Sequence, residues 1–130
     1  MPLLYIDLFE GRTPQETRNL LDTIHEAVVG AFEVPARDRY QVVRMHPPDE
    51  IVALDTGLGL SRSAGLVIVH VVSRKRRKAD KVRFYSMLAD DLSRNCGLRP
   101  DDLIVSIVEN QDEDWSFGRG RAQFLTGELH

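Results

Sequence analysis

The chain carries a weak internal repeat of apolar residues with a spacing of 64 positions. When the sequence is shifted by that amount, Asp38 falls on Asp102 (102 − 38 = 64), and apolar residues meet apolar residues in both halves. The apolar positions of the first half are Leu3, Tyr5, Leu8, Leu20, Leu21, Ile24, Val28, Phe32, Val34 and Tyr40, and they meet Val67, Val69, Val72, Phe84, Tyr85, Leu88, Leu92, Cys96, Leu98 and Ile104. Identity is low, but the shared pattern predicts two structural units of the same kind.

Each unit is predicted to be a strand, a helix and a second strand. Residues 3–8 and 65–72 are short apolar runs rich in β-branched and aromatic residues, as buried strands are, and strands near 39–44 and 102–108 close the units. The first helix begins after Thr13, because Thr13-Pro14-Gln15-Glu16 is a capping box with proline at the first helical position.

Each half contains a stretch in which apolar residues recur at the spacing of a helix. The apolar residues at 20, 21, 24, 28 and 32 form one stripe of the first helix. A second helix with the matching stripe covers about 78–95 and is predicted to end at Gly97, because glycine tolerates the left-handed conformation of a helix cap.

These elements predict an α/β (α+β) fold in a single domain, 1–130, made of two pseudo-repeats (about 2–44 and 65–108) and a C-terminal tail. Right-handed crossovers place both helices on one face of a four-stranded sheet. The other face is left bare and apolar, so oligomerisation is expected. If the first and third strands ran parallel, Pro2 and Arg74 would lie at opposite ends of the sheet. A neighbouring subunit, or antiparallel pairing of the two units, would remove that separation.

The segment between the repeats, 45–64, contains Pro47-Pro48 and a glycine-rich stretch, Thr56-Gly57-Leu58-Gly59-Leu60. Residues Ile51 to Leu54 are predicted to form a short edge strand. No helix clearly follows Gly57 and Gly59, and no lysine stands where a phosphate-binding loop needs one, so this stretch is interpreted as a turn.

Composition narrows the class of protein. At 130 residues, with 42% hydrophobic and 28% charged residues, the chain has the balance of a soluble domain. No run approaches the roughly 20 apolar residues of a membrane-spanning helix, and no basic region precedes the first apolar run, so neither a membrane span nor a secretory signal is expected. The single cysteine excludes an internal disulfide and favours the cytoplasm, and the net charge of −3 argues against general nucleic-acid binding.

Pro2 is the first candidate for chemistry. If the initiator Met1 is removed, Pro2 carries a secondary amine in a rigid ring. An ordinary α-amine has a pKa of about 7.7–8.0, and a secondary amine is more basic. Such a group can act as a base, an acid or a carbonyl-condensing nucleophile near neutral pH. Because proline makes up about 5% of residues in general, its position alone proves nothing.

The basic cluster Arg74-Lys75-Arg76-Arg77-Lys78 has three interpretations. It can be a solvated loop, which is the most common role of such runs. It can contact nucleic acid, although it lacks interleaved aromatic residues. One or two of its arginines can instead bind a carboxylate, which suits their forked and permanently charged side chains.

Other polar and aromatic residues carry weaker signals. Asp38 lies in a turn that enters a strand. Its counterpart in the second half, Asp102, is expected to be an ordinary turn acid. Trp115 lies near Phe117 and Phe124, and such residues more often belong to a core or an interface than to a substrate wall. The four histidines share no metal-ligand spacing with each other or with a cysteine, and Cys96 is interpreted as packing, so no metal site is expected.

Taken together, Pro2, the duplicated unit and the arginine pair resemble the tautomerase superfamily, and within it the malonate semialdehyde decarboxylases. The resemblance runs nearly end to end. It includes Pro2-Leu3-Leu4, Glu10-Gly11-Arg12-Thr13, Asp38-Arg39-Tyr40-Gln41, Asp55-Thr56-Gly57-Leu58-Gly59, Ser73-Arg74, Arg76, and Asp114-Trp115-Ser116-Phe117-Gly118-Arg119-Gly120-Arg121-Ala122. Pro2 alone is a weak signal, whereas its combination with Asp38, the two arginines and the tryptophan block is specific.

The resemblance implies a homotrimer with active sites near subunit boundaries, a small carboxylate substrate, and neither a metal nor an organic cofactor. It implies that Pro2 is the catalytic amine and that Asp38 completes the site. Arg74 and Arg76 would hold the substrate carboxylate, beside an apolar wall formed by Trp115, Phe117, Phe124 and Leu129. Lys75 stands between the arginines where a close relative has proline, which leaves substrate preference open.

The expected reaction is the decarboxylation of malonate semialdehyde (3-oxopropanoate) to acetaldehyde and CO2. The same residues suit hydration or dehalogenation of small unsaturated acids, or enol–keto tautomerisation of a 2-oxo acid. A non-enzyme alternative stays open, because retention of Met1 would turn the Pro2 nitrogen into an amide and leave a trimeric interaction protein.

Overall fold

The computed structural model describes residues 2–130, and the predicted removal of Met1 therefore lies outside the described residues. The two repeats supply the main elements. These are β1 (Leu3–Phe9), α1 (Pro14–Phe32), β2 (Tyr40–His46), β3 (Val67–Arg74), α2 (Lys78–Cys96) and β4 (Leu103–Asn110), with short helices η1 (Pro48–Glu50), η2 (Pro100–Asp102), η3 (Asp112–Asp114) and α3 (Gln123–Thr126). The predicted strands and helices are therefore present, and several extend one or two residues further than expected.

The spacing of 64 residues recurs in the structure. Helix α2 begins and ends 64 residues after α1 (78 − 14 = 64 and 96 − 32 = 64), and η3 follows η1 at the same distance (112 − 48 = 64). The apolar pattern therefore marks positions that have the same secondary structure in the two halves.

Local signals set the helix ends as predicted. The Thr13 hydroxyl accepts a hydrogen bond from the Glu16 backbone N–H at 3.1 Å, and the Glu16 carboxylate accepts one from the Thr13 N–H at 2.9 Å. At the end of α2, Gly97 adopts φ +65° and donates its N–H to the carbonyl oxygens of Leu92 and Ser93. Both caps satisfy backbone groups that a helix end otherwise leaves unpaired.

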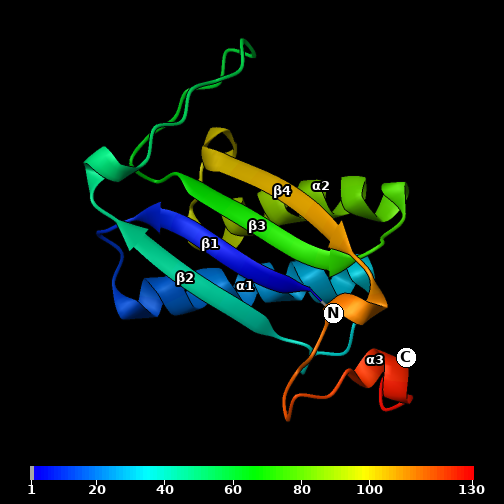
Figure 1. The fold of residues 1–130 in the computed structure, drawn as a ribbon. Helices are drawn as coiled ribbons and strands as arrows, with labels where there is room; N and C mark the ends of the chain where they lie inside the picture. Colours follow the sequence, from blue (N-terminus) through cyan, green and yellow to red (C-terminus); the bar gives the residue numbers. More distant parts are fainter. Residues whose placement is uncertain (1) are drawn as a thin grey trace.

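The four strands form one mixed sheet in the order β2-β1-β3-β4. Strands β1 and β2 pair in parallel, as do β3 and β4, and both long helices cover the same face (Figure 1). The predicted four-stranded sheet with two helices on one face is thereby confirmed.

Of the two arrangements left open by the sequence, the antiparallel one is present: β1 and β3 pair antiparallel, with Leu3 opposite Val72 and Leu8 opposite Val67. The reason lies in the connection between the repeats. Strand β2 ends at His46, opposite Phe9, so the connection leaves the sheet at the end where β1 finishes. Since β3 begins at that same end, it must run back along β1. The start of β1 and the end of β3 consequently share one end of the sheet.

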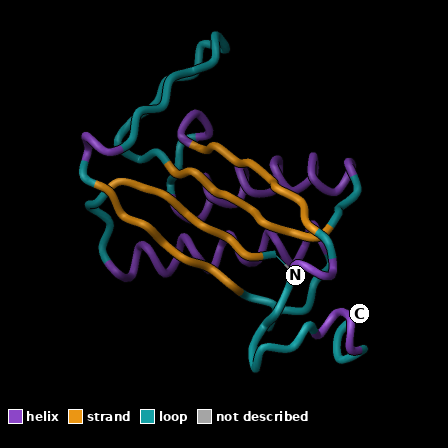
Figure 2. The backbone as a smooth tube through the Cα atoms, in the orientation of Figure 1, coloured by secondary structure: helices purple, strands orange, loops and turns teal. Residues whose placement is uncertain are grey.

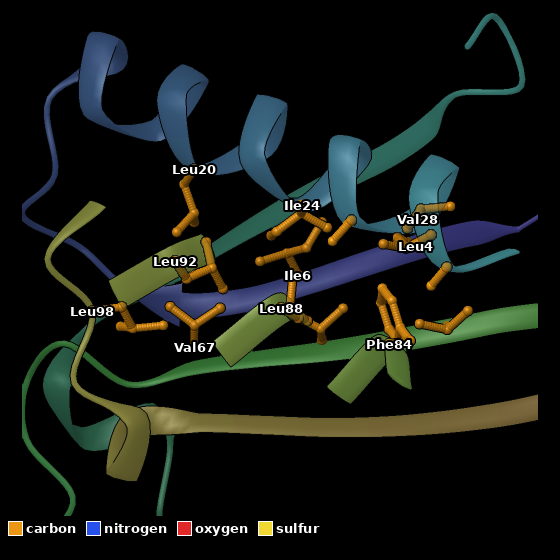
Figure 3. Close-up of a cluster of buried hydrophobic side chains, with 14 of the residues drawn as sticks. Leu4, Ile6, Leu20, Ile24, Val28, Val67, Phe84, Leu88, Leu92 and Leu98 are labelled. Atoms are coloured by element: carbon orange, nitrogen blue, oxygen red, sulfur yellow. The ribbon is translucent and has the colours of Figure 1, made fainter. Parts of the chain in front are cut away.

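The hydrophobic core lies between the helices and the sheet (Figure 3). Alternate residues of β1 are buried against the helices, and the apolar stripe of α1 packs on them as predicted. The fully buried side chains include Ile6, Leu8, Leu20, Ile24, Val28, Val67, Phe84, Leu88 and Leu92. Within residues 2–130 no helix covers the opposite face of the sheet. Tyr40, Val42 and Val108 remain exposed there, although Phe117 of the C-terminal segment lies against the Tyr40 ring, with ring centres 5.6 Å apart.

The connection between the repeats contradicts one prediction. Residues Ile51 to Leu54 form no edge strand, because the segment leaves the sheet and extends away from it as an irregular arm (Figures 1 and 2). Val52 and Leu54 are therefore 87% and 79% exposed. At the arm's tip the expected turn is present, with Gly57 at φ +79° and its N–H donated to the Asp55 carboxylate at 3.1 Å.

Among residues 2–130, no helix is both long enough and apolar enough to cross a membrane.

Candidate active site

The sheet end where β1 begins and β3 finishes gathers most of the predicted site. Pro2 is buried and precedes the Leu3–Val72 pair by one position, so it lies opposite Ser73 in the antiparallel register. Alternation along a strand places Pro2 and Ser73 on the side that faces the helices. Arg74 follows as the last residue of β3. The antiparallel pairing therefore places Pro2 and Arg74 at the same end of the sheet within one subunit, although Pro2 is not among the residues that line the cavity at that end.

A cavity of about 360 Å³ opens beside these residues. Its walls come from the end of α1 and the turn after it, the end of β3, and the C-terminal segment. The lining residues are Phe32, Glu33, Val34, Pro35, Arg37, Asp38, Arg74, Arg76, Phe124, Leu129 and His130. Five residues predicted for the site, Asp38, Arg74, Arg76, Phe124 and Leu129, therefore lie around one cavity.

The side chain of Arg76 contacts uncharged partners, whereas its backbone N–H donates to the Glu109 carboxylate at 2.8 Å. Its Nε donates a hydrogen bond to the Ser73 hydroxyl at 2.9 Å, and its guanidinium carbon lies 5.3 Å from the centre of the Phe32 ring. Burial, and secondly the neighbouring charge of Arg74, lower the pKa of Arg76 from its ordinary value, while Asp80, Asp38 and Glu109 act in the opposite direction. Within residues 2–130 no carboxylate forms an ion pair with this half-buried guanidinium.

Arg74 has a charged partner instead. Its Nε lies 3.0 Å from Oδ1 of Asp112, a residue of η3, and its guanidinium carbon lies 4.1 Å above the Phe124 ring. The ion pair offsets part of the positive charge of Arg74, and the aromatic contact fixes one face of the guanidinium. The two arginines therefore bring different electrostatics to the same cavity.

The aromatic residues of the tail form a connected stack. Trp115 lies parallel to Phe117 with ring centres 5.2 Å apart, and Phe117 meets Phe124 edge-on at 5.5 Å. Trp115 is buried, and its indole N–H donates to the Asn110 side-chain oxygen at 2.7 Å. The stack links the end of β4 to the ring that covers Arg74.

Two predicted wall residues occupy a neighbouring position. Trp115 and Phe117 line a separate cavity of about 490 Å³ over the bare face of the sheet, together with Leu3, Tyr5, Tyr40, Val72, Asn110, Asp114 and Ser116. Through Phe117 they support Phe124, which belongs to the cavity of Asp38 and the arginines. The structure thus places the predicted wall in two adjoining parts.

Three residues that shape the site are not part of the predicted set. Ser73 stands three residues before Arg76 and accepts a hydrogen bond from its Nε. Asn110, the last residue of β4, accepts the indole N–H of Trp115, and Asp112 of η3 pairs with Arg74. The first two pairs are close in the sequence, so a search for polar neighbours of the predicted residues could find them. The Asp112–Arg74 pair joins distant segments and depends on the fold.

Within the described chain, residues 2–130, no group of three or more histidine, cysteine, aspartate or glutamate side chains is arranged to hold a metal ion.

Comparisons with known proteins agree on one family. Two family models, both described as tautomerase enzymes, match residues 38–118 and 2–61. The chain is 52% identical to the probable tautomerase YrdN of Bacillus subtilis (strain 168), covering 99% of this chain and 100% of that protein. It is 32% identical to the probable tautomerase YusQ of the same organism, with 96% and 99% of the two chains covered.

Solved structures extend this result. A malonate semialdehyde decarboxylase, solved in wild-type, mutant and inactivated forms, is 56% identical with a TM-score of 0.97, and the match covers 98% of this chain and 99% of that chain. A second malonate semialdehyde decarboxylase, inhibited by 3-bromopropiolate, is 40% identical with a TM-score of 0.93, covering 98% and 97%. A fused 4-OT, 20% identical with a TM-score of 0.78 over 96% and 98% of the chains, shares the fold. By sequence and by structure, this chain belongs to the tautomerase superfamily of enzymes.

Proposed function

We propose that the chain is a cofactor-independent decarboxylase that converts malonate semialdehyde to acetaldehyde and CO2 with the amine of Pro2. The observation that carries the proposal is the half-buried guanidinium of Arg76, which has no carboxylate partner in the described chain and lines a cavity with Asp38 and Arg74. A cation in that state is suited to bind a small carboxylate. Similarity to two malonate semialdehyde decarboxylases supports the choice of substrate.

The reaction needs an electron sink at the aldehyde. Loss of CO2 from a 3-oxo acid breaks the bond to the carboxylate carbon and leaves its electron pair as an enolate. A protonated Pro2 can donate its proton to the aldehyde oxygen, and protonation of the α-carbon then gives acetaldehyde. Condensation of the free amine to an iminium would serve the same purpose.

Asp38 bears on which form of Pro2 acts. Burial and the two arginines lower the pKa of the amine, whereas a neighbouring carboxylate raises it. We expect Asp38 to keep Pro2 mostly cationic at neutral pH, which favours proton donation. Titration of the Pro2 nitrogen by 15N NMR tests this step, and a pKa well below 7 would exclude the protonated form.

The arginines orient the substrate in this proposal. A strong ion pair stabilises the very charge that the reaction removes, so tight binding by itself slows the step. Their useful contribution is to hold the breaking carbon–carbon bond at right angles to the carbonyl plane, while the aromatic residues of the tail exclude water. Arg76 is expected to be the main anchor, because the charge of Arg74 is already partly offset by Asp112.

A homotrimer is part of the proposal. The face of the sheet opposite the helices exposes apolar side chains, among them Val42 and Val108, which association with further copies would cover. Sedimentation equilibrium measures the mass directly. The variant Val108→Lys is expected to weaken association, and a wild-type chain that sediments as a monomer would contradict this part.

Hydration of a small unsaturated acid is a second candidate activity. The 56% identical structure was solved to explain both decarboxylase and hydratase activities, and the 40% identical one holds an enzyme inhibited by an acetylenic acid. In this reaction the arginines would draw charge toward the carboxylate, Asp38 would orient water, and Pro2 would protonate the α-carbon.

Incubation with malonate semialdehyde, followed by assays for acetaldehyde and CO2, tests the main proposal. Wild-type protein should release both products, and the Pro2→Ala variant, which lacks the secondary amine, should release far less. Intact-mass analysis of the same sample reports whether Met1 is absent. Retained Met1 with no product release would favour the trimeric interaction protein. Equal turnover by both proteins would remove the amine mechanism.

A further inference from the structure

Ser73 is a buried polar residue in an apolar row. It is 0% exposed and belongs to the face of β3 that packs under the helices, where the alternate residues before it are Val69 and Val71. A hydroxyl in such a position costs free energy unless it is hydrogen-bonded. Its oxygen accepts a hydrogen bond from Nε of Arg76 at 2.9 Å, and its proton is donated to the Arg74 carbonyl oxygen at 2.8 Å.

The contact restrains a side chain that is otherwise free to move. Arginine has several rotatable bonds, and Arg76 lies beyond the last residue of β3, in the loop before α2. Ser73 engages only Nε, and the Phe32 ring lies beside the guanidinium carbon. Among residues 2–130 nothing hydrogen-bonds to the two terminal nitrogens, and these can form two parallel hydrogen bonds to a carboxylate.

The register adds a second geometric link. Ser73 lies opposite Pro2 across the antiparallel pair, so the residue that holds the guanidinium is the cross-strand neighbour of the proposed amine. We propose that Ser73 is a positioning residue, whose hydroxyl sets the orientation of Arg76 relative to Pro2 so that the carboxylate and the aldehyde of one substrate are engaged together. This inference rests on the proposed function for its substrate, but the Ser73–Arg76 contact can be tested without turnover.

Without the hydroxyl, Arg76 has acidic neighbours to turn toward. Asp38 lines the same cavity, and Arg74 repels Arg76. The charges of Asp80 and Glu109 also act on Arg76, although these two carboxylates already pair with Arg77 and Lys81. Loss of the Ser73 hydroxyl should therefore let the guanidinium leave the carboxylate-binding orientation while the charge stays in the cavity. This differs from deletion of Arg76, which removes the charge altogether.

A double-mutant cycle on the full chain separates positioning from general packing. Ser73→Ala is expected to lower kcat/KM for malonate semialdehyde by about 10- to 100-fold. Arg76→Ala should cost more, and the double variant should be no worse than Arg76→Ala alone. Additive losses would overturn the proposal, because they would show that Ser73 acts independently of Arg76.

Two further variants distinguish a loss of positioning from a general defect in packing or folding. Ser73→Cys keeps nearly the same volume, and its thiol is a poor acceptor, so it should behave like Ser73→Ala. Thr23→Ala removes another buried hydroxyl, this one in α1, and should leave kcat and KM unchanged. Wild-type kinetics in Ser73→Cys would overturn the proposal.

Two measurements need no turnover. The 15N–1H signal of the Arg76 Nε, assigned by its loss in Arg76→Lys, should exchange slowly with water in the wild-type protein and rapidly in Ser73→Ala. Binding of sodium malonate by calorimetry should weaken about tenfold in Ser73→Ala. Unchanged malonate affinity and exchange in the variant would overturn the Ser73 proposal. If both change while the wild-type protein releases no acetaldehyde, the proposed reaction fails and the positioning role stands.

Discussion

Arg74 and Arg76 line the same cavity but use their Nε groups differently. Arg74 places its Nε 3.0 Å from the Asp112 carboxylate, whereas Arg76 donates its Nε to the neutral hydroxyl of Ser73 at 2.9 Å. A guanidinium paired with a carboxylate has less attraction left for a ligand than one held by a hydroxyl. The two arginines are therefore expected to contribute unequally to carboxylate binding.

Arg76→Ala should lower kcat/KM for malonate semialdehyde by on the order of 100-fold, because charge-assisted hydrogen bonds are worth about 1.5–3 kcal/mol each. Arg74→Ala should cost less, about tenfold. Asp112→Asn keeps the side-chain shape but removes the competing charge, so it should lower KM a few-fold. Steady-state kinetics of the three variants decide the point. A larger loss in Arg74→Ala, or a raised KM in Asp112→Asn, would reverse the assigned roles.

The bare face of the sheet carries a charged cluster centred on Asp7. Its carboxylate accepts hydrogen bonds from Arg44 at 3.0 and 2.9 Å and from Nε2 of His46 at 2.7 Å, and Nε2 of His70 lies 2.8 Å away. Burial raises the pKa of Asp7, but the hydrogen bonds from Arg44 and His46 outweigh it and lower the net value. The hydrogen bond to Asp7 raises the pKa of His46, and the hydrogen bond to Glu50 also raises it.

The raised pKa of His46 makes the stability of the fold depend on pH. A histidine whose pKa is higher in the folded than in the unfolded state stabilises the fold below its unfolded value of about 6.5. That contribution disappears as pH rises through the raised pKa. Urea unfolding should show a higher midpoint at pH 6 than at pH 9, and His46→Gln should reduce this difference. Asp7→Asn, which removes the partner, should reduce it too, and an unchanged pH dependence in both variants would contradict the assignment.

Thr17 offers a stabilising substitution. Its hydroxyl is buried on the inner side of α1 and has no hydrogen-bond partner among the described residues. Thr17→Val replaces the hydroxyl with a methyl group of similar shape, and should raise the free energy of unfolding by about 1 kcal/mol, since an unpaired buried polar group is costly. Thr13→Ala is the matched contrast, because loss of the helix cap should lower stability by about 1 kcal/mol. Denaturant titration measures both, and a destabilised Thr17→Val would show that the hydroxyl is satisfied in solution.

The single tryptophan reports on the tail. Trp115 is 9% exposed, stacks on Phe117 and donates its indole N–H to Asn110. Asn110→Ala removes the acceptor and should shift Trp115 emission to longer wavelength, because the ring loses its fixed position and meets water. Asn110→Asp keeps an acceptor and should retain the wild-type spectrum. Identical emission from Asn110→Ala would show that the stack alone holds the ring.

Much of this molecule follows from local signals in the sequence. The signals for the two long helices are local. The capping box at Thr13 begins α1, the left-handed cap at Gly97 ends α2, and each helix carries its own apolar stripe, so both helices could be predicted nearly to their ends. The repeat of 64 residues indicated which segments share a structure. Pro2, Asp38, Arg74 and Arg76, taken with the family resemblance, predict a carboxylate-handling site, and variants of Pro2 and of the two arginines test that prediction.

The direction in which the two units join was decided only by the tertiary structure. Apolar periodicity is the same for a parallel and an antiparallel pair of units, so it cannot tell whether Pro2 and Arg74 share an end of the sheet. The register of β1 and β3 settles that they do, and it also places Ser73 opposite Pro2. The edge strand expected at Ile51 to Leu54 was wrong for a related reason, because an apolar run becomes a strand only where a neighbouring strand is within hydrogen-bonding reach. The contact between two distant segments, η3 and the end of β3, therefore determines that Arg74 is paired with Asp112.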